Sequence, residues 1–365
     1  MKNTSSLEAE PFETYTEFDE VSELLDESQL VSHPRLGWGR SVSRQREAEE
    51  IGRSGLISHP RLGYGRSVRR TPAVGELDTG EVEIVGPTDD RILSTNTLQV
   101  PFRWICCLDL YFPDPDNLTK DMLFRGSGTL VSPRHVLTAG HCLWDEVEGS
   151  KGTKAKLEVR AIKVTPGRNG VDASGKPRQP LGSNESVAVR YSRNWESSLS
   201  PEFDYGLITL KNSIGTTLQP ALGNRPLGFW GSKEWGAGTR INPRDPNVLL
   251  NKPVNISGYP ADKCGDQPPK WSASDAALAA CPVNKWGSNQ WRAYGRVKGV
   301  SPSPSRLIYH DLDTKGGHSG SPVWLRWQDF RNLIAIHTGW EVFGVSNRAV
   351  RITADVWRDV QSWMR

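Results

Sequence analysis

The chain has 365 residues, 24% of them charged and 36% apolar, with a formal net charge of +3. The length allows two domains or one large domain with a tail, and so small a charge gives no reason to expect nucleic acid as a partner. No apolar run approaches the roughly 18 residues of a membrane span, and the first thirty residues lack the apolar core of a signal peptide.

The first eighty residues differ in composition from the rest of the chain. Residues 1–30 contain nine acidic side chains against Lys2 alone, and residues 31–70 contain nine arginines. Blocks of opposite charge with few large apolar residues cannot bury enough surface to fold alone. We therefore expect residues 1–83 to be a largely disordered leader or propeptide.

This segment contains a two-copy repeat. LVSHPRLGWGRSV (Leu30–Val42) returns as LISHPRLGYGRSV (Leu56–Val68). Two copies are too few for a solenoid. One interpretation is a duplicated stretch of disordered leader; the other is a short recognition or inhibitory motif, with Trp38 or Tyr64 as its aromatic anchor.

From about residue 84, short strand-like runs alternate with clusters of Gly, Pro, Asn and Asp, which is typical of a mostly β barrel or sandwich. The helical pattern is confined to Thr353–Met364, where Thr353 is a candidate N-cap and apolar residues recur on one face. The predicted strands are Trp104–Tyr111, Gly128–Val131, His135–Thr138, Leu157–Val164, Ser186–Tyr191, Gly206–Leu210, Pro253–Gly258, Leu307–Tyr309, Val323–Arg326 and Ile334–His337.

The five cysteines include no CxxC pair, so a zinc site is not expected. Cys264 and Cys281 are placed to close a loop as a disulfide, but the sequence does not fix any pairing. The partners of Cys106, Cys107 and Cys142 also stay open. No acidic loop has the ligand spacing of a calcium site, and we expect no metal or cofactor.

Three stretches together point to nucleophilic catalysis. VLTAGHC contains His141, EFDYGLITL contains Asp204, and GGHSGSPVW contains Ser319. A serine nucleophile needs an imidazole to take its proton and a carboxylate to orient that imidazole. Glycines let successive amides turn inward, so we assign the oxyanion hole to the N–H groups of Gly317 and Ser319.

The order of the three residues along the chain separates the possible folds. His before Asp before Ser is the order of chymotrypsin-like double β-barrels, whereas α/β-hydrolases run Ser, Asp, His. Subtilisin-like enzymes place Asp before His. The order therefore favours the double barrel.

TAGHC, DYGLITL and GGHSGSPV resemble the signature blocks of trypsin-like serine proteases, specifically the glutamyl endopeptidases of bacilli and staphylococci. Further similar stretches lie within 88–97, 166–170, 256–263, 335–339 and 347–353. The resemblance covers roughly residues 84–365. It implies two six-stranded antiparallel barrels, at about 84–215 and 216–365, with a C-terminal helix.

The resemblance also implies the role of each residue. His141 would be the general base, Asp204 its orienting carboxylate and Ser319 the nucleophile. The family's preference for Glu before the scissile bond is attributed to a pocket histidine and a hydroxyl residue, which match His337 and Thr314. The alternative for His337 is an ordinary strand-end histidine.

The chain departs from the family pattern in two places. The family often has a disulfide from the cysteine after the catalytic histidine to the preceding strand, and Gly126 stands at that partner's position. In pancreatic-type relatives, an Asp before the nucleophile pairs with the new N-terminus after activation. His318 stands there, so that ion pair is not expected.

The resemblance implies a proenzyme that is secreted, acts on polypeptides and is a monomer after processing. Glu83 precedes Ile84 close to where the resemblance starts, so we expect cleavage near residues 83–85, by the enzyme itself if it prefers glutamate. Two alternatives stay open: a serine protease of the same fold with another specificity, and a catalytically silent peptide-binding module.

Overall fold

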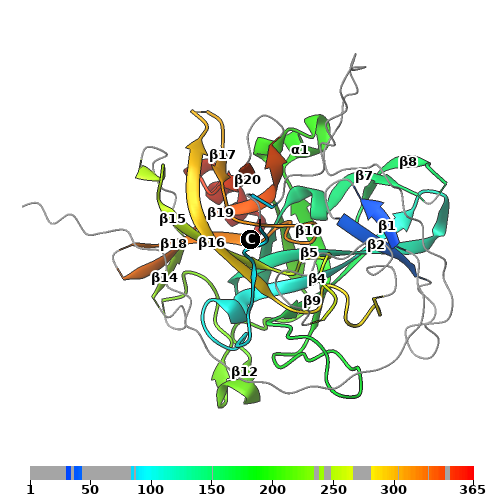
Figure 1. The fold of residues 1–365 in the computed structure, drawn as a ribbon, viewed down its shortest axis with the longest axis horizontal. Helices are drawn as coiled ribbons and strands as arrows, with labels where there is room; N and C mark the ends of the chain where they lie inside the picture. The colour runs from blue at the N-terminus through cyan, green and yellow to red at the C-terminus, as the bar shows by residue number, and fades with distance from the viewer. Residues whose placement is uncertain are drawn as a thin grey trace, which may run out of the picture.

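A computed structural model gives the fold (Figure 1) and describes residues 30–33, 37–42, 84–85, 88–149, 151–233, 238–241, 248–265, 281–302, 304–327, 329–341 and 346–365. Most of the predicted leader, the second copy of the repeat and Glu83 lie outside these residues. The predictions made for them stay predictions.

The first barrel is closed by six antiparallel strands in the order β5-β4-β9-β10-β11-β6, with β6 pairing back onto β5. β4 is buried along nearly its whole length, so both of its faces serve as core. The strands are β4 (Ile105–Asp114), β5 (Asn117–Ser132), β6 (His135–Thr138), β9 (Ala161–Pro166), β10 (Asn184–Tyr191) and β11 (Gly206–Leu210).

The second barrel is closed in the same way in the order β19-β18-β15-β16-β17-β20, with β20 pairing back onto β19. β14 (Thr239–Ile241) adds to β19 in parallel, and β3 (Ile92–Leu93) pairs with β16. The closing strands are β15 (Pro253–Gly258), β16 (Trp291–Val300), β17 (Leu307–His310), β18 (Pro322–Trp327), β19 (Phe330–Glu341) and β20 (Ser346–Arg351). The expected double six-stranded barrel is thus confirmed within the described residues.

Shorter elements lie around the barrels. Two small hairpins are formed by β7 (Trp144–Glu148) with β8 (Lys154–Glu158) and by β12 (Leu218–Gln219) with β13 (Arg225–Pro226). The helical segments are η1 (Phe102–Trp104), η2 (Gly140–Cys142), α1 (Arg193–Ser198), η3 (Pro201–Phe203), η4 (Pro220–Leu222) and α3 (Ala354–Trp363).

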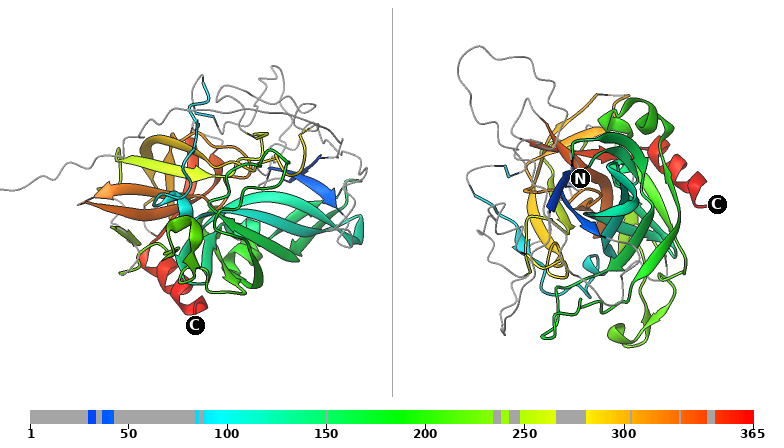
Figure 2. Two further views of the ribbon diagram at one scale, coloured as in Figure 1. Left: turned by 90° about the horizontal axis from the view of Figure 1, so that it is seen from below. Right: turned by 90° about the vertical axis from the view of Figure 1, so that its right-hand side faces the viewer.

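The C-terminal helix α3 is confirmed close to its predicted bounds. Thr353 caps it, because its Oγ1 accepts a hydrogen bond from the N–H of Val356 at 3.2 Å. Val356 and Val360 face the core, and the helix lies at the outside of the molecule (Figure 2). None of the helices in the described part of the chain is long and apolar enough to cross a membrane.

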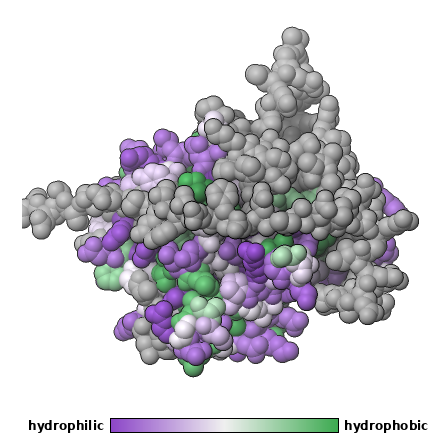
Figure 3. Space-filling view, turned by 60° about the horizontal axis from the view of Figure 1, so that its bottom comes forward, coloured by the Kyte–Doolittle hydropathy of each residue, from purple (hydrophilic) through white to green (hydrophobic). Residues whose placement is uncertain are grey.

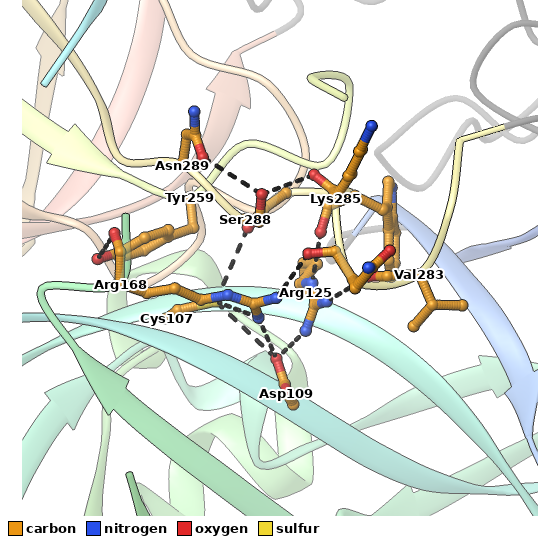
Figure 4. A network of polar contacts seen from close by, with 12 residues as sticks. Cys107, Asp109, Arg125, Arg168, Tyr259, Val283, Lys285, Ser288 and Asn289 are labelled. Atoms are coloured by element: carbon orange, nitrogen blue, oxygen red, sulfur yellow. Dashed lines mark hydrogen bonds and ion pairs between the residues drawn. The ribbon is translucent and has the colours of Figure 1, made fainter. Parts of the chain in front are cut away.

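A buried polar network joins the two barrels (Figure 4). Arg125 of β5 forms an ion pair with Asp109 of β4 and donates to the carbonyl oxygens of Trp286 and Val283, at 3.0 Å each. Arg168 lies 3.5 Å from the same Asp109 carboxylate. Buried charges are tolerated when they are paired and hydrogen-bonded, so this cluster fixes segment 283–286 against the first barrel.

One part of the segment expected to be a leader is described. β1 (Leu30–His33) and β2 (Gly37–Val42) form an antiparallel hairpin, drawn in blue in Figures 1 and 2, and β2 pairs with Asp121–Phe124 of β5. These two strands are the first copy of the repeat.

Most predicted strands coincide with observed ones, and β6, β11 and β15 match exactly. The single strand predicted over Leu157–Val164 is wrong. The chain bends between β8 and β9, where Val159 N–H donates to Leu143 and Arg160 N–H to Tyr111.

Figure 3 shows hydrophilic side chains interspersed with small apolar areas on one face. The exposed large apolar side chains of the described residues come from separate parts of the chain: Ile92, Leu118, Val187, Leu218, Leu250 and Tyr294.

Candidate active site

His141 and Asp204 meet because neighbouring strands position them. His141 lies in η2 just after β6, Asp204 comes just before β11, and these two strands pair with Thr138 opposite Gly206. Asp204 Oδ2 lies 2.8 Å from His141 Nδ1, and Oδ1 accepts from the His141 main-chain N–H, also at 2.8 Å. Both side chains are fully buried.

This pairing fixes the tautomer of the imidazole. A carboxylate only accepts hydrogen bonds, so Nδ1 of a neutral His141 carries the proton and Nε2 is left as the acceptor. Nε2 has no hydrogen-bond partner among the described residues. Trp195 packs beside the ring, with centroids 6.3 Å apart.

The loop that carries Ser319 packs directly against the His141 turn. The carbonyl oxygen of Ser319 accepts from the N–H of Ser127 at 2.8 Å and from the thiol of Cys142 at 3.7 Å. Gly320 has φ +86°, and a Cβ there would overlap both Ser127 O and Thr138 Oγ1. The loop therefore needs glycine at this position to approach so closely.

The loop is also braced from the second barrel. Gly317 has φ +95°, and a Cβ on it would overlap the carbonyl oxygen of Tyr259. The N–H of Ala261 donates to Gly316 O at 2.6 Å, and Ser127 Oγ donates to Gly317 O at 2.7 Å. Both barrels thus hold the turn before Ser319.

The two predicted pocket residues are buried near this loop. Thr314 lies in the loop itself, and its Oγ1 is buried without a hydrogen-bond partner among the described residues. His337 lies on β19, where its main-chain N–H donates to Ser321 O at 2.9 Å and its carbonyl accepts from Gly320 N–H at 2.8 Å. The whole residue is 1% exposed.

His310 is a further histidine at the site, which no sequence motif pointed to. This residue ends β17, is fully buried, and its Nε2 lies 3.4 Å from Nδ1 of His337. Burial lowers the pKa of His310 to about 3, and burial together with His310 holds the pKa of His337 well below its usual value. Both imidazoles are therefore neutral at pH 7. The only available signal was a histidine at the end of a predicted strand shortly before the serine loop.

His318 packs inward. It is fully buried, its Nδ1 lies 3.3 Å from Ser321 Oγ, and burial lowers its pKa to about 3. The nearby charges are held in ion pairs: Arg91 contacts Asp262 at 2.5 Å and Asp89 at 2.7 Å, and Lys263 contacts Asp89 at 2.8 Å.

The cysteines divide into one disulfide and three buried thiols. Cys264 and Cys281 form the disulfide that the sequence left open, and Cys106, Cys107 and Cys142 are free. A Cβ placed on Gly126 would lie 3.3 Å from Cys142 Sγ, so Gly126 indeed faces Cys142. The described residues contain no group of three or more His, Cys, Asp or Glu side chains placed to hold a metal ion.

Comparisons with known proteins agree with the fold described above. The family model described as a trypsin-like peptidase domain matches residues 126–331, more than half of the chain. The solved structure of a Glu endopeptidase in complex with MPD superposes with a TM-score of 0.51 at 20% identity, covering 77% of this chain and 98% of that one. At that identity, the similarity establishes the fold.

Three curated relatives are similar in sequence. The glutamyl endopeptidase of Bacillus licheniformis is 28% identical over 76% of this chain and 67% of its own length. An extracellular metalloprotease of Bacillus subtilis is 27% identical, over 77% and 69% respectively. The inactive serine protease 35 of Mus musculus is 23% identical, over 68% and 63%. Taken with the family match and the barrels, these similarities show that the chain belongs to the trypsin-like peptidase family.

Proposed function

We propose that the protein is a serine endopeptidase in which His141, Asp204 and Ser319 form the catalytic triad. The observation that carries the proposal is the pair of 2.8 Å hydrogen bonds from His141 to Asp204, beside a loop that holds Ser319 against the same turn. This arrangement orients Nε2 of the imidazole as the proton acceptor.

The reaction proceeds through an acyl-enzyme. Ser319 Oγ attacks the peptide carbonyl while His141 Nε2 takes its proton, and the protonated imidazole then gives that proton to the leaving amine. Water, activated by the same imidazole, hydrolyses the ester. The N–H groups of Gly317 and Ser319 stabilise the oxyanion, supported by the positive φ of Gly317.

The substrate preference is for Glu, or Asp, before the scissile bond. A substrate carboxylate needs O–H and N–H donors, and the buried Thr314 Oγ1 without a partner and the His337 imidazole offer them. The relative from Bacillus licheniformis is itself a glutamyl endopeptidase. A carboxylate entering the pocket would stabilise the protonated form of His337, which burial otherwise disfavours.

Processing near residues 83–85 fits the surroundings of this segment. The N–H groups of Val85 and Asp90 donate to the two carboxylate oxygens of Asp313, at 2.7 and 2.6 Å, directly before Thr314. A cut there leaves the new N-terminus tied to the pocket loop. We also infer secretion and a monomeric mature enzyme that acts on polypeptides.

A fluorophosphonate probe tests the proposal directly. It should label the wild-type chain, after removal of the leader if necessary, and should fail to label Ser319→Ala. A proteome-derived peptide library then gives the residue preference: enrichment of Glu before the cut supports the pocket assignment, and another preference leaves only the general protease assignment.

The second candidate is a catalytically silent peptide-binding module, favoured by the similarity to an inactive serine protease. It predicts that wild type and Ser319→Ala behave alike towards the probe and still bind peptides.

A further inference from the structure

One edge of β5 forms main-chain hydrogen bonds with three different segments along its length. Its Asp121–Phe124 segment pairs with β2, the N–H of Ser127 donates to the carbonyl of Ser319, and Thr129–Ser132 pairs with β6. The opposite edge is filled by β4 from Asn117 to Thr129. The first barrel therefore does not itself cover the Asp121–Phe124 edge.

An uncovered strand edge exposes N–H and C=O groups that readily pair with another strand. Strand addition bonds main chain to main chain, so it depends mainly on the added segment being able to extend. In this structure, the added segment is Gly39–Val42.

The chain contains a second segment that meets the same requirement. The four residues of β2 that pair with β5 read Gly-Arg-Ser-Val, and the second copy of the repeat has the same four residues at Gly65–Val68. The two copies differ only by Val31 for Ile57 and Trp38 for Tyr64, and neither Val31 nor Trp38 is among the residues that pair with β5.

The second copy also has enough chain to reach the edge. After Val68, sixteen residues run from Arg69 to Ile84. Fully extended, they span up to about 50 Å, roughly the diameter of a domain of this size. Anchoring Val85 on Asp313 therefore does not prevent Val68 from approaching Asp121 within the same chain.

We propose that the Asp121–Phe124 edge of β5 is a strand-docking site and that the two repeat copies compete for it within one chain. The first copy occupies it in the structure, and the second replaces it when the first is disabled. Cleavage near residue 83 would cut the covalent connection but leave the docked copy bound. The inference does not depend on catalytic activity.

Amide hydrogen exchange of the full chain tests this, read on the peptide that covers Asp121–Phe124. Proline removes the N–H that a ladder needs, so the three test chains are Arg40→Pro with Ser41→Pro, Arg66→Pro with Ser67→Pro, and all four changes together. Each chain, including the reference, carries Ser319→Ala so that self-processing cannot remove the leader.

We expect each two-proline chain to exchange within twofold of the reference, because the intact copy covers the edge. The four-proline chain should exchange at least tenfold faster there, with β9 and β10 unchanged as evidence of folding. A synthetic peptide of residues 56–68 should restore protection. The matched control, with alanine at the same four positions, keeps its N–H groups and should match the reference.

Three results would overturn the proposal. Loss of protection in the Arg40→Pro, Ser41→Pro chain would show that the copies are not interchangeable. Unchanged protection in the four-proline chain would show that the repeats do not cover the edge. A repeat-dependent dimer in sedimentation would show docking between chains instead of within one.

Discussion

Nδ1 of His337 lies 3.4 Å from Nε2 of His310, and both rings are buried beside the serine loop. At most one proton can lie between two neutral nitrogens, so His310 influences which nitrogen of His337 carries hydrogen. If His337 binds a substrate carboxylate as proposed, His310 acts on it as a positioning residue.

Replacing His337 by Ala should lower kcat/KM for a Glu-ending substrate by about 10- to 100-fold, the value of a hydrogen bond to a charged group. A matched Gln-ending substrate should lose much less, and the ratio of the two specificity constants measures the effect. Equal losses for both substrates would contradict the assignment of His337 to the pocket.

Replacing His310 by Ala should weaken Glu selectivity less than His337→Ala does, mainly through KM, because His310 acts through its neighbour. His310→Gln retains a polar atom near His337 Nδ1 and should recover part of the loss. A purely structural role would instead lower kcat for the Glu- and Gln-ending substrates alike, without rescue by Gln.

Asp204→Asn should lower kcat by about 10⁴-fold while leaving the fold intact. The Asn amide donates hydrogen, so it favours the imidazole tautomer protonated on Nε2, which cannot accept the serine proton. Steady-state kinetics check the rate, and near-UV circular dichroism checks the fold. Activity within tenfold of wild type would show that His141 does not depend on Asp204.

Acid should destabilise the protein through its buried histidines. The pKa of His318 is about 3 when folded and near its ordinary value of 6.5 when unfolded, so between these pH values only the unfolded state binds the proton. The free energy of unfolding then falls by about 1.4 kcal/mol for each pH unit below about 6 from this group. Above pH 6.5, His318 no longer makes the free energy of unfolding depend on pH.

His318→Gln tests this contribution, because the amide keeps a polar partner for Ser321 without titrating. Urea unfolding at pH 4.5 and pH 7 should show a smaller acid loss in the variant than in wild type. An identical loss in the two proteins would mean that His318 is protonated in the folded state.

Gly126→Cys should create a second disulfide. The Cβ position on Gly126 lies 3.3 Å from Cys142 Sγ, and the nearest obstacle at 2.9 Å is the end of the Leu110 side chain, which can move. Thiol titration of the denatured variant should find Cys106 and Cys107 alone. Closing this short loop should raise the free energy of unfolding by up to about 3 kcal/mol. If adding a reductant left the urea unfolding midpoint of the variant unchanged, the disulfide would be contradicted.

The sequence predicted the strands whose apolar residues are continuous, such as Gly206–Leu210, because both of their faces are buried. It missed β16, where Trp291, Ala293 and Val297 are buried, because Gly295 takes the place of an apolar residue between Ala293 and Val297. It also missed β20, because this strand begins with the polar residues Ser346, Asn347 and Arg348. Its pairing with β19, which closes the barrel, is visible only in the structure.

The candidate site could be predicted from the sequence because its residues stand in short motifs, and the order of these motifs along the chain is specific to one kind of fold. His310 could not be predicted, because a single histidine at a strand end forms no recognisable motif. It comes close to His337 only because β17 and β19 both pair with β20. The hydrogen bond from Val85 to Asp313 could not be predicted either, because 228 positions separate the two residues in the sequence.

The order of partners along β5 also limits how long a peptide can lie beside this strand. Phe124 faces Gly39 of the docked hairpin, and Ser127 holds the carbonyl of Ser319. Three residues of extended chain measure about 10 Å. While β2 is paired with β5, a peptide lying beside β5 from the serine loop has space for about three residues before it meets the hairpin, and a longer one must displace it.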